Sequence, residues 1–217
     1  MIKLIIFDFD GTLGDTRANI VKTMQDTMRT IDLPMRGEAE IAATIGLPLE
    51  KGFGQLFPGL SGEEYAHCAA TYREIFNKNL KILTPGLFPG VKDTLERLAA
   101  TGRTLTVASS RSSASLNGFL RDMGISGFVS YVLGADNVSK AKPDPEPVLK
   151  TLRELGFNDG DSLVVGDMPV DIMMGARAGT HTCAVTWGNA SREDLEASGA
   201  EHVIDSMPEL FNVLDLH

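Results

Sequence analysis

The chain has 217 residues, of which 43% are hydrophobic and 23% are charged, and its formal net charge is −9. This composition is typical of a globular protein with a sizeable core, and the acidic balance argues against nucleic acid or an anionic membrane as a general partner. An anionic substrate remains compatible with it, because a metal ion or a lysine can reverse the field inside a cleft.

The pattern of the chain also indicates the compartment. We find no basic segment followed by an apolar stretch and a cleavage site, and no apolar run of membrane-spanning length. The two cysteines, Cys68 and Cys183, are far apart and lack a metal-ligand pattern, which favours two reduced thiols. We therefore expect a cytoplasmic protein.

The first part of the chain predicts one strand and then only helices. Residues 3–9 are rich in β-branched and aromatic side chains and are bounded by Gly11, as in a buried strand. Helical spacing follows, broken at Leu33-Pro34, and we see no strand signal between residues 38 and 80. The predicted helices cover residues 16–31, 38–45, 49–57 and 62–80.

From Thr84 onward, predicted strands alternate with predicted helices. The strands cover residues 105–109, 131–133, 162–167, 181–187 and 202–205. The helices cover residues 91–100, 113–123, 146–155, 170–178, 191–198 and 207–214. This alternation predicts an α/β fold with a doubly wound parallel sheet, a Rossmann-like core. We expect the core to consist of residues 1–14 and 84–217, with an α-helical cap domain, residues 15–83, inserted after the first strand.

Two carboxylates follow the first strand. Asp8 and Asp10 are two residues apart, so on an extended chain their side chains point the same way. In an open parallel sheet, ligands bind at the carboxyl ends of the strands. Gly11 and Thr12 come next, and a glycine lets backbone N–H groups approach an anion closely.

Other strand ends carry polar groups that complement these acids. Ser109 ends the second core strand, Asp167 ends a later one, and Asp171 lies one helical turn further on. Lys142 precedes Pro143, which favours an extended conformation at a loop end. Carboxylates suit Mg²⁺, and a lysine with N–H donors suits a phosphoryl group, so the sequence predicts a site for both at one sheet edge.

The four motifs that carry this chemistry are DFDGTLGDT, VASS, KAKPDP and GDMPVD. Each is weakly specific alone, but in this order they resemble the haloacid dehalogenase superfamily of phosphatases. The segments IGLPLEKGF, PGLFPGVKDTLERLAATG and VTWGNASREDLEASGAEHVIDSMPEL are similar to the phosphoglycolate phosphatase-like branch with a helical cap. The resemblance covers nearly the full chain.

The resemblance implies a mechanism. Asp8 would be the nucleophile that forms an aspartyl-phosphate, and Asp10 the general acid and base. Ser109 and Lys142 would hold the phosphoryl oxygens as catalytic residues. Mg²⁺ would be held by Asp8, the backbone carbonyl of Asp10, Asp167 and Asp171. The predicted phosphate- and substrate-binding residues are Gly11, Thr12, Ser109, Ser110 and Lys142, joined by Arg17 and Lys51 from the cap.

The sequence departs from that branch near the site. Gly14 stands where a larger residue is usual, Ser110-Arg111 where an Asn-Lys pair is frequent, and Asn189 where an aromatic residue is frequent. These departures concern the substrate rather than the chemistry. We expect a small phosphorylated metabolite as partner; phosphoglycolate, pyrophosphate, a sugar phosphate and a nucleoside monophosphate stay open. A monomer and a homodimer are both compatible with the sequence.

Several activities other than a phosphatase share part of this pattern. A phosphomutase or a pyrophosphatase would use the same aspartates. A dehalogenase has no use for Asp10, and a phosphonate-cleaving relative needs a cap lysine where Leu49 stands, with Lys51 nearby. A phospho-aspartate receiver module would share the fold and the acids but has no use for a cap of this size.

Overall fold

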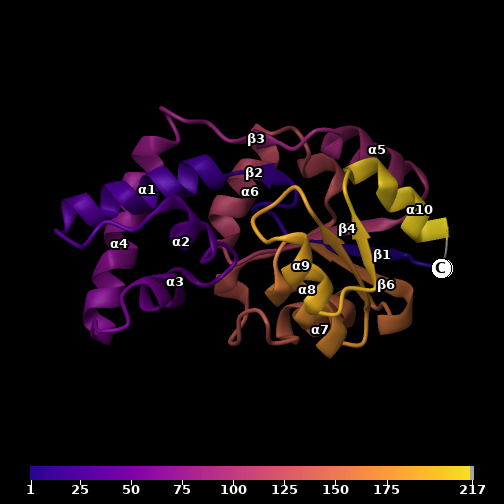
Figure 1. Cartoon of the computed structure of the whole chain (residues 1–217). Coiled ribbons are helices and arrows are strands. Elements are labelled where there is room, and N and C mark those ends of the chain that lie inside the picture. The colour runs from indigo at the N-terminus through magenta and orange to yellow at the C-terminus, as the bar shows by residue number, and fades with distance from the viewer. Residues whose placement is uncertain (216–217) are drawn as a thin grey trace.

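A six-stranded, fully parallel sheet forms the centre of the computed structural model, which describes residues 1–215 (Figure 1). Its order is β5-β4-β1-β6-β7-β8. The strands are β1 (Leu4–Phe7), β4 (Thr104–Ala108), β5 (Tyr131–Leu133), β6 (Ser162–Gly166), β7 (His181–Val185) and β8 (His202–Ile204). The predicted α/β fold with a doubly wound parallel sheet is confirmed.

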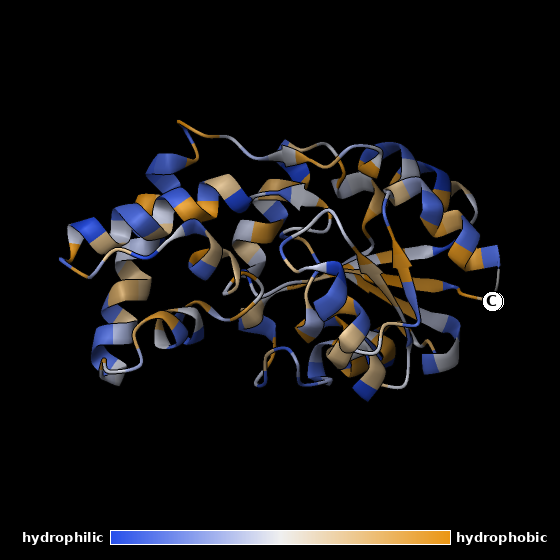
Figure 2. Cartoon of the chain, in the orientation of Figure 1, coloured by the Kyte–Doolittle hydropathy of each residue, from blue (hydrophilic) through white to orange (hydrophobic). Residues whose placement is uncertain are grey.

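Helices cover both faces of the sheet because alternate strand residues point to opposite sides. Ile5 and Phe7 belong to the core cluster shared with α5, α6 and α10, whereas Leu4 and Ile6 pack in the cluster formed with α7 and α8. Figure 2 shows the central strands as mostly hydrophobic. The core helices are α5 (Val91–Ala100), α6 (Ser113–Asp122), α7 (Glu146–Leu155), α8 (Pro169–Arg177), α9 (Arg192–Ala197) and α10 (Leu210–Asp215).

Short 3₁₀ segments complete the core: η1 (Ser126–Phe128), η2 (Ala135–Asn137), η3 (Asp159–Asp161) and η4 (Met207–Glu209). The predicted last helix, 207–214, therefore starts as a 3₁₀ turn and becomes α-helical only at Leu210. Within residues 1–215, no helix has the length and apolarity that crossing a membrane requires.

The register of the central strands brings their carboxyl ends level. Phe7 of β1 pairs with Val107 of β4 on one side and with Val165 of β6 on the other. From β1 the chain continues outward through β4 and β5, and it then returns to the other side for β6 to β8. The end of β1 is therefore next to the point where the strand order reverses, which is where open α/β sheets bind ligands.

The segment after β1 forms a helical layer beside the sheet (Figure 1). It contains α1 (Arg17–Thr30), α2 (Glu38–Ala42), α3 (Leu49–Leu56) and α4 (Gly62–Asn79). Buried residues of these helices, such as Met28, Phe53 and Phe76, belong to the same hydrophobic cluster as one face of the sheet. This helical layer, called the cap below, therefore packs against the core.

A small ribbon that the sequence does not predict joins this layer to the core. The strand β2 (Gly14–Asp15) pairs antiparallel with β3 (Gly86–Leu87). Two-residue strands are too short for a period-2 pattern, so they leave no periodic signal in the sequence. The expected boundary at 14/15 falls within β2, and the one at 83/84 lies just before β3; this division of the chain stays a prediction.

The packing of α5 predicts a large stability effect at one position. Leu95 is fully buried, so Leu95→Ala should lower the free energy of unfolding by about 2–5 kcal/mol through lost burial and a residual cavity. Leu149→Ala on α7 is the control, because Leu149 is 46% exposed and should cost less than about 0.5 kcal/mol. Urea unfolding followed by circular dichroism measures both, and equal losses would contradict the observed packing.

Candidate active site

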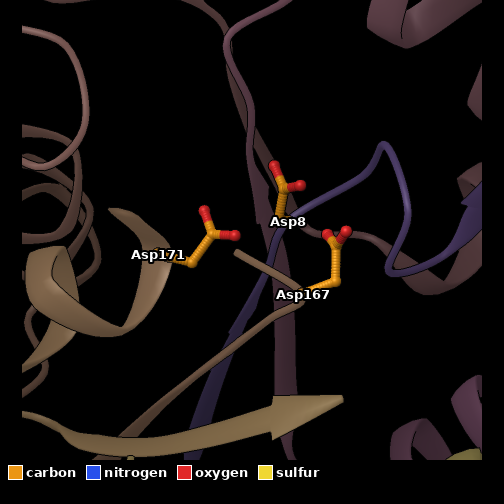
Figure 3. Close-up of side chains that lie close together, drawn as sticks. All are labelled: Asp8, Asp167 and Asp171. Carbon is orange, nitrogen blue, oxygen red and sulfur yellow. The ribbon is translucent and has the colours of Figure 1, made fainter. Parts of the chain in front are cut away.

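Three buried carboxylates meet at the carboxyl edge of the sheet (Figure 3). Asp8 follows β1, Asp167 follows β6, and Asp171 lies in the first turn of α8. One carboxylate oxygen from each lies within 4.8 Å of the others. The structure therefore brings together three of the four predicted metal ligands through their side chains.

Lys142 is the cation of this cluster. Its Nζ donates to Asp8 Oδ1 at 2.5 Å and to Asp171 Oδ1 at 2.7 Å, and its side chain is only 2% exposed. Burial alone would lower the pKa of Lys142, but the carboxylates of Asp171 and Asp8 outweigh it and raise that pKa. The two carboxylates therefore favour the charged form of Lys142, whose hydrogen bond orients Asp8.

The cluster carries more negative charge than Lys142 offsets. Burial raises the pKa of Asp8 well above its usual value despite the opposing field of Lys142, and burial together with Asp171 raises the pKa of Asp167 to about 7. Among the described residues, Asp8 Oδ2 is buried and finds no hydrogen-bond partner. A buried acceptor without a donor and three carboxylates around one ammonium group fit a hard divalent cation such as Mg²⁺.

Neighbouring groups fix the orientation of Asp167. Thr12 Oγ1 donates to Asp167 Oδ1 at 2.9 Å, and Asn189 donates to Oδ2 through its backbone N–H at 2.8 Å and through Nδ2 at 2.9 Å. Trp187 Nε1 donates to the carbonyl oxygen of Thr12 at 3.1 Å. These supporting contacts hold the carboxylate without requiring any substrate.

Glycines allow the chain to pack this closely around the acids. A Cβ on Gly166 would overlap the side chain of Asp171, and one on Gly188 would overlap that of Asp167. Gly11 has φ +90°, and a Cβ there would meet both Asp167 and Asn189. Any side chain at these three positions would displace an acid, so the glycines are part of the geometry of the site.

The side chain of Asp10 has different partners from those of the three-acid cluster. Arg111 donates to both of its carboxylate oxygens at 2.7–2.9 Å, and Thr16 Oγ1 donates to Asp10 Oδ1 at 2.6 Å. The Asp10 side chain is 11% exposed and lines a large cavity between the cap and the core. The side chain predicted to act on protons is therefore held by Arg111 and Thr16 and lines the cavity, whereas Asp8, Asp167 and Asp171 do not line it.

Arg111 is enclosed by aromatic rings. Its guanidinium carbon lies 4.7 Å from the ring centre of Phe119 and 4.9 Å from that of Phe76. Phe119 belongs to the core and Phe76 to the cap, and their rings are 6.2 Å apart. Ring faces attract a cation, so Arg111 connects Asp10 to an aromatic ring of the core and to one of the cap.

The remaining predicted residues differ in their placement. Ser109 is buried, accepts from the backbone N–H of Arg111 at 3.2 Å, and lines a small cavity together with Lys142. Ser110 instead donates to the Gly46 carbonyl of the cap at 2.6 Å. The backbone N–H of Gly11 donates to Gly14 at 3.0 Å, within the loop after β1. Their roles toward a phosphoryl group stay predictions.

The two predicted cap residues are not part of the acid cluster. Arg17 pairs with Glu38 at 3.2 Å, and its side chain is 39% exposed. Lys51 is exposed, and neither residue lines the large cavity. Leu47, Pro48 and Glu50, which lie close to Lys51 in the sequence, do line it.

From the sequence, Arg111 and Asn189 are only departures from a related branch, and no role follows for either. Thr16 entered only as the start of a helix. Their partners lie 6 to 101 residues away along the chain, so local patterns do not reveal these contacts. Only their positions in the sequence could have indicated a role, because Arg111 and Asn189 follow strand ends and Thr16 follows the loop after β1.

Comparisons with known proteins show which family the chain is similar to. Residues 5–185 match the family of haloacid dehalogenase-like hydrolases. "Probable phosphatase IndB" of Dickeya dadantii is 37% identical, with 97% of this chain and 92% of the relative covered. A pyrophosphatase named PpaX of Bacillus velezensis is 30% identical over 98% of this chain and 96% of the relative. A phosphoglycolate phosphatase of Aquifex aeolicus is 29% identical, covering 100% and 98%.

The solved structure of a haloacid dehalogenase-like family hydrolase of Streptococcus pneumoniae has the same fold, with a TM-score of 0.87 and 22% identity over 98% of each chain. The chain belongs to the haloacid dehalogenase-like hydrolase family. Two predictions are confirmed: the resemblance to the phosphoglycolate phosphatase-like branch of this family, and the class of phosphoric monoester hydrolase.

The close packing of Gly188 predicts a metal-binding defect. Gly188→Ala should push Asp167 out of place and raise the Mg²⁺ concentration needed for half-maximal thermal stabilisation by about 10–100-fold. Gly160→Ala is the matched control, because Gly160 is exposed and has no atom within 4 Å of an added Cβ. Thermal unfolding is measured during Mg²⁺ titration after treatment with chelator. Equal Mg²⁺ requirements for both variants would contradict the placement of Asp167 at a metal site.

Proposed function

We propose that the protein is a Mg²⁺-dependent phosphatase that hydrolyses a small phosphate monoester through an aspartyl-phosphate on Asp8. The observation that carries the proposal is the arrangement of Asp8. Its Oδ1 is held by Lys142, its Oδ2 has no partner among the described residues, and two further buried acids lie beside it. Such a carboxylate is oriented and desolvated, and the charge of Lys142 favours the anionic form that a nucleophile requires.

In the first step, Asp8 attacks phosphorus, and the bond between phosphorus and the leaving oxygen breaks. Lys142 keeps Asp8 in place through its hydrogen bond and is itself anchored by Asp171. The leaving oxygen takes a proton from Asp10. For this, Asp10 must carry a proton and turn one oxygen away from Arg111, which occupies both oxygens in the structure.

In the second step, water attacks the phosphorus of the aspartyl-phosphate. Asp10, now ionised, accepts a proton from this water, and Asp8 leaves as a carboxylate. When bound, Mg²⁺ supplies positive charge that stabilises the phosphoryl oxygens. Asp8, Asp167 and the backbone carbonyl of Asp10 would hold it, with Asp171 completing or supporting the set.

A pyrophosphatase is the second candidate, because a relative with 30% identity carries that name. Phosphoglycolate is supported in the same way by the relative of Aquifex aeolicus. A receiver module would hold its phosphate rather than turn it over. Sustained release of phosphate from an aryl phosphate would therefore exclude it. A cytoplasmic location and a monomeric or homodimeric state stay predictions.

The two aspartates should fail differently. Asp8→Asn removes the nucleophile, so a nitrophenyl phosphate should give neither turnover nor a burst of nitrophenol. Asp10→Asn loses proton transfer, which is worth about 10²–10⁴-fold in rate. Because nitrophenolate is a good leaving group, this variant should still phosphorylate Asp8 and then stall.

Stopped-flow absorbance should show a burst of about one nitrophenol per active site for Asp10→Asn. Mass spectrometry should find the phosphate on Asp8, sensitive to hydroxylamine. Identical behaviour of both variants, or phosphate on another residue, would overturn the proposed division of roles.

The predicted contact of Arg17 and Lys51 with substrate needs a separate test. If either residue contacts substrate, Arg17→Ala or Lys51→Ala should change kcat/KM by several-fold for some phosphate esters and not for others. An equal effect on every ester, or none, would show that the pair are solvated charges of the cap surface.

A further inference from the structure

The cavity beside Asp10 lies where the leaving group would go. It has a volume of about 1010 Å³ and is lined by Asp10, whereas Asp8, Lys142 and Asp167 do not line it. Under the proposed function, Asp10 protonates the leaving oxygen, so the alcohol part of the substrate extends from Asp10 into this space. The cavity is far larger than the two carbons and one carboxylate of a glycolate group.

The walls of the cavity are largely apolar. Tyr72 and Phe76 of α4 have stacked rings with centres 5.7 Å apart, and Phe76 meets Phe119 of α6 edge to face. Aliphatic side chains continue the surface on the cap side and along α6. They are Ile20, Met24, Ile45, Leu47, Leu49, Leu80 and Met123. Such walls bind ligands mainly by removing apolar surface from water.

The charges around the cavity are unfavourable for an anion. Four carboxylates line it, from Asp10, Glu50, Asp122 and Asp136, against two guanidinium groups, from Arg73 and Arg111. Among the residues that line it within the described chain, there is no lysine or histidine.

Both guanidinium groups already have partners. Arg111 gives three hydrogen bonds to Asp10, and Arg73 pairs with Glu50 at 3.0 Å on an exposed rim. A second anionic group on the substrate that reached Arg111 would have to draw it away from Asp10, whose buried carboxylate would then keep only the hydrogen bond from Thr16. That exchange is costly, because it uncovers a buried charge.

We propose that the substrate is the phosphate monoester of an uncharged alcohol that carries an apolar or aromatic portion, seated against Tyr72, Phe76 and Phe119. The inference rests on the proposed function and names its substrate class. It separates this chain from an enzyme for phosphoglycolate or pyrophosphate, whose leaving groups are anionic. The uncharged polar residues of the lining, such as Thr44, Asn77 and Ser112, would contact the rest of the alcohol.

A matched set of esters tests the charge of the leaving group. The purified protein with Mg²⁺ is given benzyl phosphate, 4-carbamoylbenzyl phosphate, 4-carboxybenzyl phosphate, phosphoglycolate and pyrophosphate, and phosphate release gives kcat/KM. The carbamoyl and carboxy esters have nearly the same size and differ in charge. The carbamoyl ester should be preferred by about tenfold or more, because like charges in a site repel.

Benzyl phosphate should exceed phosphoglycolate and pyrophosphate by a similar factor. Preference for an anionic leaving group, or no discrimination between the carbamoyl and carboxy esters, would overturn this inference while leaving the phosphatase activity intact. No turnover of any ester would instead overturn the proposed function.

A charge variant locates the effect in the cavity. Asn77 is an exposed residue of α4 that lines the cavity, so Asn77→Lys adds a cation without burying it. This variant should raise kcat/KM for the carboxy ester relative to the carbamoyl ester by about 3–10-fold.

Ala66→Lys is the control, since Ala66 is exposed on the same helix but does not line the cavity. It lies about 16 Å further along the helix, beyond a Debye length at physiological salt. Thermal unfolding checks that both variants are folded. An unchanged ester ratio in folded Asn77→Lys, or an equal change in Ala66→Lys, would contradict binding of the alcohol in this cavity.

Discussion

The buried ammonium group of Lys142 is the constraint on which the site depends. It contacts Asp8 and Asp171, while Asp167 lies beside them with hydrogen bonds from Thr12 and Asn189. Three buried carboxylates around one cation leave an excess of two negative charges when all are ionised. Burial of this excess is costly, and the raised pKa values of Asp8 and Asp167 express that cost. A divalent cation matches the excess, which is a physical reason to expect one here.

The backbone supports this arrangement in two ways: the strand ends are aligned, and the loops that follow them approach the acids closely. Parallel pairing of β1 with β4 and β6 brings the strand ends into one plane, so residues separated by some 160 positions become neighbours. Glycines at positions 166 and 188 then let the following loops approach the acids without a side chain in between. The same sheet that forms the hydrophobic core therefore sets the distances between the acids.

This explains how far the sequence could predict the site. Strand ends are local features, and Asp8, Lys142, Asp167 and Asp171 could be placed at one edge from the order of strands and helices alone. The β2–β3 ribbon could not, because two-residue strands carry no periodicity. The pairing of Arg111 with Asp10 could not be predicted either, since it depends on the conformation of the loop after β4, and the two residues are 101 positions apart in the sequence. Ser110 shows the same limit, because its hydroxyl reaches Gly46 of the cap.

Arg111 also shows why the cavity is harder to predict than the acid cluster. From sequence, an arginine near a phosphate site suggests a ligand for a second anion. In the structure its hydrogen bonds go to Asp10 and its faces meet Phe76 and Phe119. The charge of Arg111 is therefore paired within the protein, and the part of the cavity wall around Arg111 is aromatic. Counting cations in the sequence would overstate the attraction for anions, because what a ligand experiences depends on which charges already have partners.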